Sequence, residues 1–264
     1  MAPRDWFSPL NPPVRDWHGQ RVWLVGASSG IGAALARALL AAGARVALSA
    51  RTRERLLGVA GRSRNALVLP MDATQPAQWT AGMDLLQAQW QGIDLVIFCS
   101  AQYQPERSWE IRAEGVRSML ESNLASVYFG IETVLPALLE RGSGGLAIVS
   151  SVAGYMGLPN ATVYGPTKAA LINLAELLYL DLHPRGIAVT LIDPGFVQTA
   201  LTARNTFPMP ALITPEEAAG YILAGFAAGR FEIDFPWRFT RVVRFVSRLP
   251  YRLRFSLLGR ILGA

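Results

Sequence analysis

Two side chains one helical turn apart are the strongest candidates for chemistry in this sequence. They begin and end the run Tyr164-Gly165-Pro166-Thr167-Lys168, and Lys168 is the one lysine in a chain with 24 arginines. Random thinning of lysines could explain that scarcity, but not this location. A free phenol titrates near ~10, and an ammonium on the same helix face lowers that pKa. The pair therefore predicts an acid–base group, with Tyr164 protonating an alkoxide or deprotonating an alcohol.

Two adjacent serines precede this pair. Ser151 lies 13 residues before Tyr164, just after an expected strand over 146–150. Ligands gather at the carboxyl ends of strands in open α/β sheets. Ser150 would face the opposite side of the strand, because successive strand residues alternate. We therefore favour Ser151 as the hydroxyl that orients a substrate oxygen.

A glycine-rich turn indicates a nucleotide. It lies between an apolar run over 22–25 and an Ala/Leu-rich stretch over 31–42. Glycines allow a tight turn and close approach to a pyrophosphate, and the helix N-terminus adds free N–H groups. The alternative is a structural turn without a ligand. The expected nucleotide contacts in this turn are Gly26, Ser28, Ser29, Gly30, Ile31 and Gly32.

The ends of the next two strands bear on which nucleotide binds. Arg51 follows the strand expected over 45–49, and no acid occurs before Glu54. An acid at this place suits NAD, whereas an arginine accommodates the 2′-phosphate of NADP. We expect NADP to be favoured over NAD, the alternative being that Arg51 is a solvated surface residue. Asp72, followed by Ala73, is expected to accept a hydrogen bond from the adenine amino group or to cap a helix.

The elements that must position these residues alternate along the chain. Short apolar strands followed by longer helices predict βαβ units, and so an α/β fold with a doubly wound parallel sheet. We expect one Rossmann-like domain over 20–235, an N-terminal arm over 1–19 and a tail over 236–264. The expected strands are 22–25, 45–49, 66–69, 93–99, 146–150, 188–192 and 231–235; the expected helices are 31–42, 75–91, 114–139 and 163–182, and one that begins with the capping sequence Thr214-Pro215-Glu216-Glu217.

Composition narrows the class of protein. Half of the 264 residues are apolar, which is enough for a sizeable core. The single cysteine, Cys99, excludes an internal disulfide and is expected to be a buried core thiol. Two histidines without zinc-type spacing argue against a metal centre. Residues 1–20 lack the apolar segment of a signal peptide, and no uncharged apolar stretch reaches the length of a spanning helix. We expect a cytoplasmic protein.

The net charge of +6 is concentrated at the C-terminal end. Residues 1–235 carry 18 basic and 19 acidic side chains, whereas 236–264 carry seven arginines and no acid. This distribution argues against a nucleic-acid surface. The tail arginines recur at helical spacing with apolar residues between them, and Pro250 ends the pattern. We expect a basic amphipathic helical tail that contacts an anionic membrane, or else one that packs on its own domain or on a partner subunit. The arginines of this face are Arg238, Arg241, Arg244 and Arg248.

A long segment over 196–213 separates the sixth strand from the capped helix. Its apolar content predicts a lid over the substrate. The segment Gly154–Pro159 and Tyr103 are expected to add apolar surface near Tyr164, so that the pocket is hydrophobic. Arg204 is the one cation expected there.

Taken together, these motifs resemble the short-chain dehydrogenase/reductase family. The resemblance covers about residues 20–235. It implies a nicotinamide-dependent hydride transfer between a carbonyl and an alcohol on one Rossmann-like domain. It rests on the glycine-rich turn 26–32, Asn123 in a long helix, Ser150-Ser151, Tyr164 with Lys168, and Pro194-Gly195.

The resemblance also implies roles that spacing alone does not give. Lys168 would bond the nicotinamide ribose, and Asn123 would hold a water that connects Lys168 to solvent. From the sequence alone, Asn123 could equally be an ordinary polar residue inside a helix. The nicotinamide contacts would fall on Pro194, Gly195, Val197 and Thr199. The chain departs from the family at 98–101, where Phe-Cys-Ser-Ala replaces Asn-Asn-Ala-Gly; this puts the adenine-side packing in question.

The sequence therefore predicts an NADP(H)-dependent oxidoreductase acting on an apolar small-molecule carbonyl or alcohol. Two alternatives stay open: a non-catalytic nucleotide-binding sensor or scaffold on the same fold, and a membrane-recruited, lipid-directed reductase. By the resemblance, helices around Asn123 and Tyr164 would pair subunits into a homodimer or homotetramer.

Overall fold

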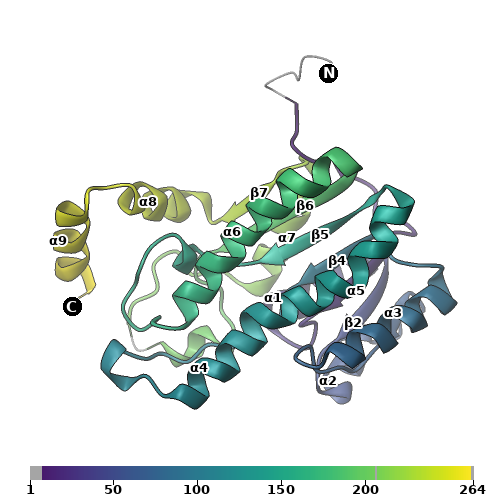
Figure 1. The fold of residues 1–264 in the computed structure, drawn as a ribbon, viewed down its shortest axis with the longest axis horizontal. Helices are drawn as coiled ribbons and strands as arrows, with labels where there is room; N and C mark the ends of the chain where they lie inside the picture. The colour runs from purple at the N-terminus through teal and green to yellow at the C-terminus, as the bar shows by residue number, and fades with distance from the viewer. Residues whose placement is uncertain (1–7, 206, 263–264) are drawn as a thin grey trace.

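The computed structural model describes residues 8–205 and 207–262. Its centre is one sheet of seven parallel strands in the order β3-β2-β1-β4-β5-β6-β7 (Figure 1). The order reverses between β1 and β4, which opens a crevice at the carboxyl ends of these strands. The strands are β1 Arg21–Val25, β2 Arg45–Ser49, β3 Ala66–Val68, β4 Leu95–Phe98, β5 Gly144–Val149, β6 Ile187–Pro194 and β7 Glu232–Phe235.

Helices cover both faces of the sheet, so the predicted doubly wound α/β fold is confirmed. Alternate residues of β1 enter different cores: Leu24 packs with the helices of one face and Trp23 with those of the other. Burial on both faces explains the continuous apolar strands. α1, α2 and α7 cover one face, and α3, α5 and α6 the other. The helices are α1 Gly30–Ala41, α2 Arg53–Ala60, α3 Pro76–Trp90, α4 Ala113–Leu120, α5 Ser126–Arg141, α6 Tyr164–Leu182, α7 Pro215–Ala227, α8 Trp237–Ser247 and α9 Tyr251–Leu262.

Two helical regions differ from the expectation. α2 was not predicted, because it is short and charged and buries only Leu56, Val59 and Ala60. The helix expected over 114–139 is interrupted by a π-helical turn, Glu121–Ala125, between α4 and α5. By length and composition alone, the stretch Ala113–Arg141 could cross a membrane. Here its inner side, including Val134 and Leu138, packs into the core against the sheet.

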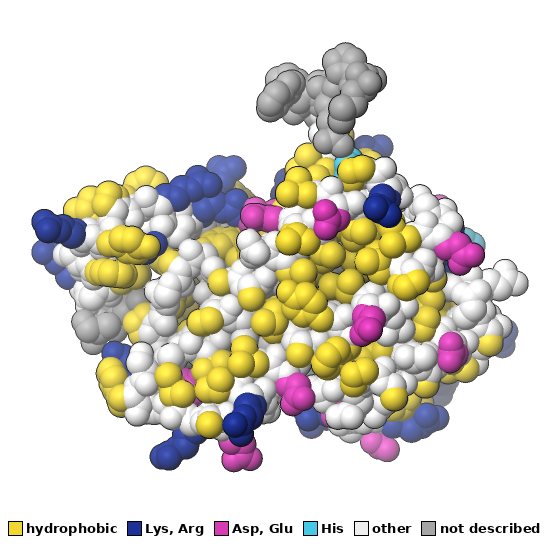
Figure 2. All heavy atoms as spheres, in the orientation of Figure 1, with side chains coloured by type: hydrophobic (Ala, Val, Ile, Leu, Met, Phe, Trp, Pro, Cys, Tyr) yellow, Lys and Arg dark blue, Asp and Glu magenta, His cyan; other side chains and the backbone are white. Residues whose placement is uncertain are grey.

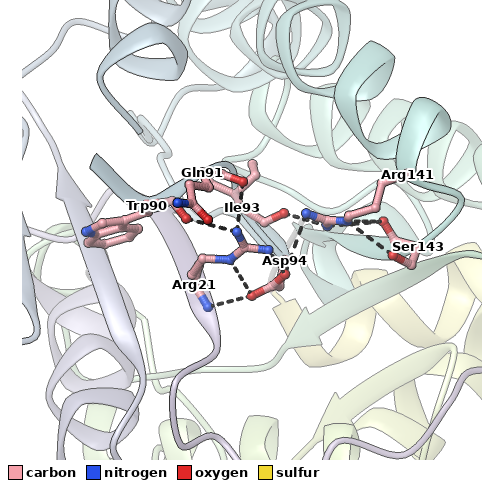
Figure 3. A network of polar contacts seen from close by, with 7 residues as sticks. All are labelled: Arg21, Trp90, Gln91, Ile93, Asp94, Arg141 and Ser143. Atoms are coloured by element: carbon pink, nitrogen blue, oxygen red, sulfur yellow. Dashed lines mark hydrogen bonds and ion pairs between the residues drawn. The ribbon is translucent and has the colours of Figure 1, made fainter. Parts of the chain in front are cut away.

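An ion-pair network links β1 and β4 at their amino ends, on the side of the sheet opposite the crevice (Figure 3). The Asp94 carboxylate accepts two bonds from the Arg21 guanidinium, at 2.5 and 2.9 Å, and a third from the Arg21 backbone N–H. Arg141 lies 3.6 Å from the same carboxylate. Burial opposes ionisation of Asp94, but the bonds from Arg21 and the charge of Arg141 outweigh it, so the pKa of Asp94 is lowered. This network has a structural role.

The arm before β1 and the helix that follows β7 both pack on the sheet domain. Of the predicted arm, residues 1–7 lie outside the described residues; in the rest, Asn11 donates to the Val189 carbonyl and Trp17 is buried in the core. At the other end, α8 packs beside β7 and Pro250 separates it from α9, as the sequence indicated. α9 extends away from the domain (Figure 1).

Candidate active site

A cleft of about 700 Å³ opens at the carboxyl ends of the central strands. Of the sequence-predicted site residues, Asn123 alone does not line it. Those that do are Gly26, Ser28, Ser29, Gly30, Ile31, Gly32, Arg51, Asp72, Ala73, Ser151, Tyr164, Lys168, Pro194, Gly195, Val197 and Thr199. Residues far apart in the sequence therefore meet at the switch point of the sheet.

The glycine-rich turn forms a cradle that larger residues would fill. Gly26 has a φ of +96°, and a Cβ there would lie 2.5 Å from the Ser100 backbone N. A Cβ on Gly32 would collide with the Gly26 carbonyl. The Ser29 side chain makes no capping bond at the start of α1, so the N–H groups of the first helical turn stay available to an anion. The cradle fits a dinucleotide pyrophosphate.

A threonine from a distant loop reaches the same cradle. A Cβ on Gly30 would lie 2.9 Å from the methyl carbon of Thr199. The loop that carries Thr199 is held by Thr202, whose hydroxyl donates to the Val197 carbonyl at 2.6 Å. Thr199 therefore lies over the helix N-terminus, where a phosphate partner is needed.

The end of β2 carries two arginines rather than one. Arg51 and Arg55 both line the cleft and are exposed. Arg55 was missed because it lies on α2, a helix that the sequence pattern did not reveal. Asp72 also lines the cleft and accepts bonds from the backbone N–H and hydroxyl of Thr74. The Asp72 carboxylate thus closes a local turn and does not cap a helix, since the N-cap residue of α3 is Gln75.

The acid–base candidates lie together at the start of α6. Tyr164 is the first residue of this helix, and Ser151 lies at the end of β5 within hydrogen-bonding reach of it. Tyr103 packs edge-on against the Tyr164 ring, with 5.0 Å between centroids. It therefore lies near Tyr164, as the sequence predicted. Ser150 also borders the cleft, but its hydroxyl donates to the Lys168 carbonyl at 2.8 Å. The geometry thus brings Ser151, and not Ser150, to the phenol.

Lys168 is deeply buried beneath the phenol. Its side chain is 1% exposed, its Nζ donates to the Val149 carbonyl at 2.9 Å, and it lies 5.5 Å from the Tyr164 ring centre. Burial lowers the pKa of Lys168 to about 8, against smaller raising effects of Cys99 and Asp193. An ammonium has three donors, so the bond to Val149 leaves others for a ligand.

One electrostatic expectation was wrong. Burial raises the pKa of Tyr164 to about 12, although a hydrogen bond with Ser151 lowers it in part. The predicted lowering by Lys168 is not seen, because the ammonium is bonded to a backbone carbonyl rather than to the phenol.

Asn123 lies in the π-helical turn, beside the cleft rather than on its wall. It is fully buried; its Oδ1 accepts from the Gln102 N–H at 2.6 Å, and its Nδ2 donates to the Gln102 carbonyl at 2.8 Å. A further bond reaches the Thr167 hydroxyl, one residue before Lys168. Asn123 therefore links the segment after β4 to α6. π-Turns inside α-helices recur at functional sites.

The departure from the family at the end of β4 has a packing solution. Phe98 lies against Trp79, with centroids 5.7 Å apart. Gly130 of α5 makes room for both rings, since a Cβ there would collide with Phe98 and lie 2.7 Å from Trp79. Cys99 is half-buried at the cleft wall, not wholly in the core as expected, and burial raises its thiol pKa to about 11. An apolar cluster thus fills the space at the end of β4.

The substrate side matches the expectation only in part. Segment 196–213 folds back on itself through a bridge between Val197 and Ile213, and Phe196 packs against Phe207 at 6.0 Å. Segment 154–159, however, does not line the cleft. Tyr155 turns away instead, and its hydroxyl lies 3.2 Å from Asp193 and 2.7 Å from Glu232. Because the Tyr155 hydroxyl is bonded to these two acids, the Tyr155 side chain does not line the cleft.

Comparison with known proteins places the chain among nicotinamide-dependent enzymes. The short chain dehydrogenase family model matches residues 20–208. An uncharacterized oxidoreductase of Myxococcus xanthus is 33% identical over 231 residues, covering 86% of this chain and 91% of its own. One of Staphylococcus aureus is 31% identical over 202 residues, covering 76% and 87%.

Solved structures agree on the fold. A short-chain dehydrogenase from Streptomyces avermitilis superposes with a TM-score of 0.78 at 23% identity, covering 93% of this chain and 98% of that one. A short-chain dehydrogenase from Sphingobium yanoikuyae in complex with NADPH gives 0.74 at 26% identity, covering 88% and 97%. A 3-ketoacyl-(acyl-carrier-protein) reductase from Brucella melitensis complexed with NADH gives 0.74 at 22%, covering 83% and 98%.

Proposed function

The chain belongs to the short-chain dehydrogenase/reductase family and is an NAD(P)-dependent oxidoreductase, and on that premise we propose that it exchanges a hydride between NADP(H) and the carbonyl or alcohol of an apolar small molecule. One observation carries the proposal. Tyr164, Ser151 and Lys168 meet in the same cleft as the glycine-rich cradle. A sensor or scaffold would need the cradle but not this trio.

Each member of the trio has a distinct part in the proposed reaction. The bound nicotinamide supplies or accepts the hydride. The Ser151 hydroxyl holds the substrate oxygen, and the Tyr164 phenol donates its proton to that oxygen as the carbonyl is reduced. The phenol carries its proton at neutral pH, as a free phenol also does, so it is available as the acid in the reductive direction. Lys168 has donors to spare for a ribose hydroxyl.

Several further residues would hold the cofactor or support the trio. The first turn of α1 and Thr199 would take the pyrophosphate, and segment 194–197 the nicotinamide. Asn123 would act through Lys168, by way of a water, as the resemblance implies. Its bonds to Gln102 and Thr167 support a positioning role.

The preference for NADP rests on charge at the end of β2. Arg51 and Arg55 both face the cleft, and an arginine there suits a 2′-phosphate. The NADPH complex of the Sphingobium enzyme is consistent with this, whereas the Brucella reductase was solved with NADH. The apolar substrate is inferred from Tyr103, whose ring packs against the Tyr164 ring, and from the side chains of Val197 and Leu201, which line the cleft.

We place the enzyme in the cytoplasm, as a homodimer or homotetramer. Hydrophobic side chains gather over α5 and α6 on one face (Figure 2). They include the exposed residues Tyr128, Leu177 and Leu180, and such a face suits pairing with a second copy.

A screen of NADPH oxidation against aldehydes and ketones of increasing chain length tests the function. We expect kcat/KM to rise with chain length and to be lost in a Tyr164→Phe variant that still binds NADPH. No turnover with any carbonyl or alcohol, by a protein that binds NADPH, would favour the sensor alternative.

A further inference from the structure

The two C-terminal helices carry an unusual outer surface. Six of the sixteen exposed large hydrophobic residues in the described chain lie between 237 and 255. They are Trp237, Val242, Phe245, Tyr251, Leu253 and Phe255. An ordinary solvated helix would turn such side chains inward. Arginine and hydrophobic side chains lie side by side over α8 and α9 (Figure 2).

The inner face of α8 packs on the domain, so the opposite face is exposed to solvent. Val243 and Val246 are buried against the domain. Arg244 donates to Glu232 and to the Tyr155 hydroxyl, and its guanidinium lies over the Tyr155 ring at 4.9 Å. The sequence analysis placed Arg244 on the exposed basic face. In the structure Arg244 instead anchors α8 to Glu232 and Tyr155. α8 is therefore held with a fixed side outward.

The outward side combines cations with aromatic rings. The guanidinium groups of the exposed Arg238 and Arg241 lie 5.3 and 4.8 Å from the Trp237 ring. The half-buried Arg254 lies 4.5 Å from the Tyr251 ring and ties α9 to α8 by donating to the Ser247 carbonyl at 2.7 Å. No acid occurs anywhere in 236–264. Arginine beside Trp and Tyr, with further apolar residues at the same level, suits the headgroup region of an anionic bilayer.

This surface lies next to the substrate loop. Phe239 of α8 packs against Phe196 at 5.5 Å, and Phe196 packs against Phe207 of the loop. A Cβ on Gly195 would lie 2.9 Å from the Phe239 ring. A row of three rings thus joins α8 to segment 196–213, part of which lines the cleft.

From this arrangement we propose that the outer faces of α8 and α9 dock the enzyme on an anionic lipid bilayer. The adjacent loop then receives a carbonyl substrate that partitions into that bilayer. The second statement rests on the proposed function; the first does not. Docking needs both components, because the arginines attract the surface and the apolar side chains enter it.

Vesicle flotation tests the docking without any turnover. Full-length protein is mixed with vesicles of phosphatidylglycerol and phosphatidylcholine, or of phosphatidylcholine alone, at low and high salt. We expect binding only to the anionic vesicles, weakened but not abolished by salt. Replacing Arg238, Arg241 and Arg248 by Gln should reduce the partition coefficient by tenfold or more. Replacing Val242 and Phe245 by Ser should remove the salt-resistant part.

A matched control separates this surface from general basicity. Arg62, Arg64 and Arg185 are exposed and lie on other elements; changing them to Gln removes the same charge and should leave vesicle binding within twofold. Equal losses in both triple variants, binding to neutral vesicles alone, or no binding at low salt would overturn the proposal. The proposal would also be overturned if the parent protein did not bind vesicles and its oligomer dissociated in the Val242→Ser, Phe245→Ser variant. The surface would then be a subunit interface.

Activity on two carbonyls tests the second statement. The Arg238, Arg241, Arg248 variant should keep its rate on a water-soluble aldehyde and lose at least fivefold on a long-chain ketone held in anionic vesicles. An equal rate on the vesicle ketone would refute delivery from the bilayer. If the parent protein reduces neither carbonyl but still floats with vesicles, the proposed function fails and the docking surface stands.

Discussion

Lys168 donates to the Val149 carbonyl oxygen at 2.9 Å, so its ammonium is tied to the end of β5 and not to the Tyr164 hydroxyl. The site is nearly closed around it, with 1% of the residue exposed. A compact group with three donors can keep this bond and still reach a ribose. The planar, bulkier guanidinium of arginine cannot take the same position.

We therefore expect Lys168→Arg to lower kcat by about 10²-fold or more, on the scale of positioned acid–base catalysis, although the charge is kept. Steady-state kinetics with a verified carbonyl measures it. Lys168→Met serves as the control, because it fills similar space without charge and should lose activity while remaining folded by circular dichroism. Full activity of the arginine variant would show that the single lysine is a compositional accident.

NADP preference should depend on the two arginines at the end of β2. We expect the parent to bind NADPH more tightly than NADH, and Arg51→Ala with Arg55→Ala to weaken NADPH binding at least tenfold with little change for NADH. Fluorescence titration gives both dissociation constants. Arg53→Ala lies between them in sequence and is the control. Equal affinities of the parent for both nucleotides would contradict the assignment.

Gly130 should be required by the rings it faces. A methyl group there meets Phe98 and Trp79, and overpacking in a core costs about 1–3 kcal/mol. Gly130→Ala should lower the free energy of unfolding by that amount in urea denaturation. Gly220→Ala is the matched control, because a Cβ at this helical position meets nothing within 4 Å; it should be neutral or stabilising. Equal stability of the two variants would argue against the packing described for 98–101.

The Asp94 network makes a pH-dependent contribution to stability. The pKa of Asp94 is lowered in the fold, so the native state favours the ionised form more than the unfolded chain does. Its contribution is present above pH ~4 and is lost as the pH falls through the folded-state pKa. Asp94→Asn should cost about 1–2 kcal/mol at pH 7 and less at pH 3. A variant that is equally destabilised at both values would show that charge is not involved.

The sequence predicted what local pattern and spacing determine. The capping box at Thr214 and Glu217 is present as expected, and the strand end at Ser150-Ser151 turned the expected hydroxyl to the phenol. The sequence pattern could not show three effects that depend on distant residues. Burial, and not Lys168, determines the direction of the Tyr164 pKa shift. Gly130 of α5 leaves room for Phe98 of β4. The ion pair with Glu232 turns Arg244 toward the domain. Arg55 was hidden because α2 has too few apolar residues to give a periodic signal.

The account depends most on Tyr164 as the proton donor. The direct measurement is single-turnover oxidation of bound NADPH by a verified carbonyl, in the parent and in Tyr164→Phe, with NADPH affinity measured in parallel. We predict a rate lower by about 10²–10⁴-fold in the variant and a dissociation constant for NADPH within about threefold of the parent. A variant rate within a few-fold of the parent would contradict the account, because the phenylalanine ring has no proton to give.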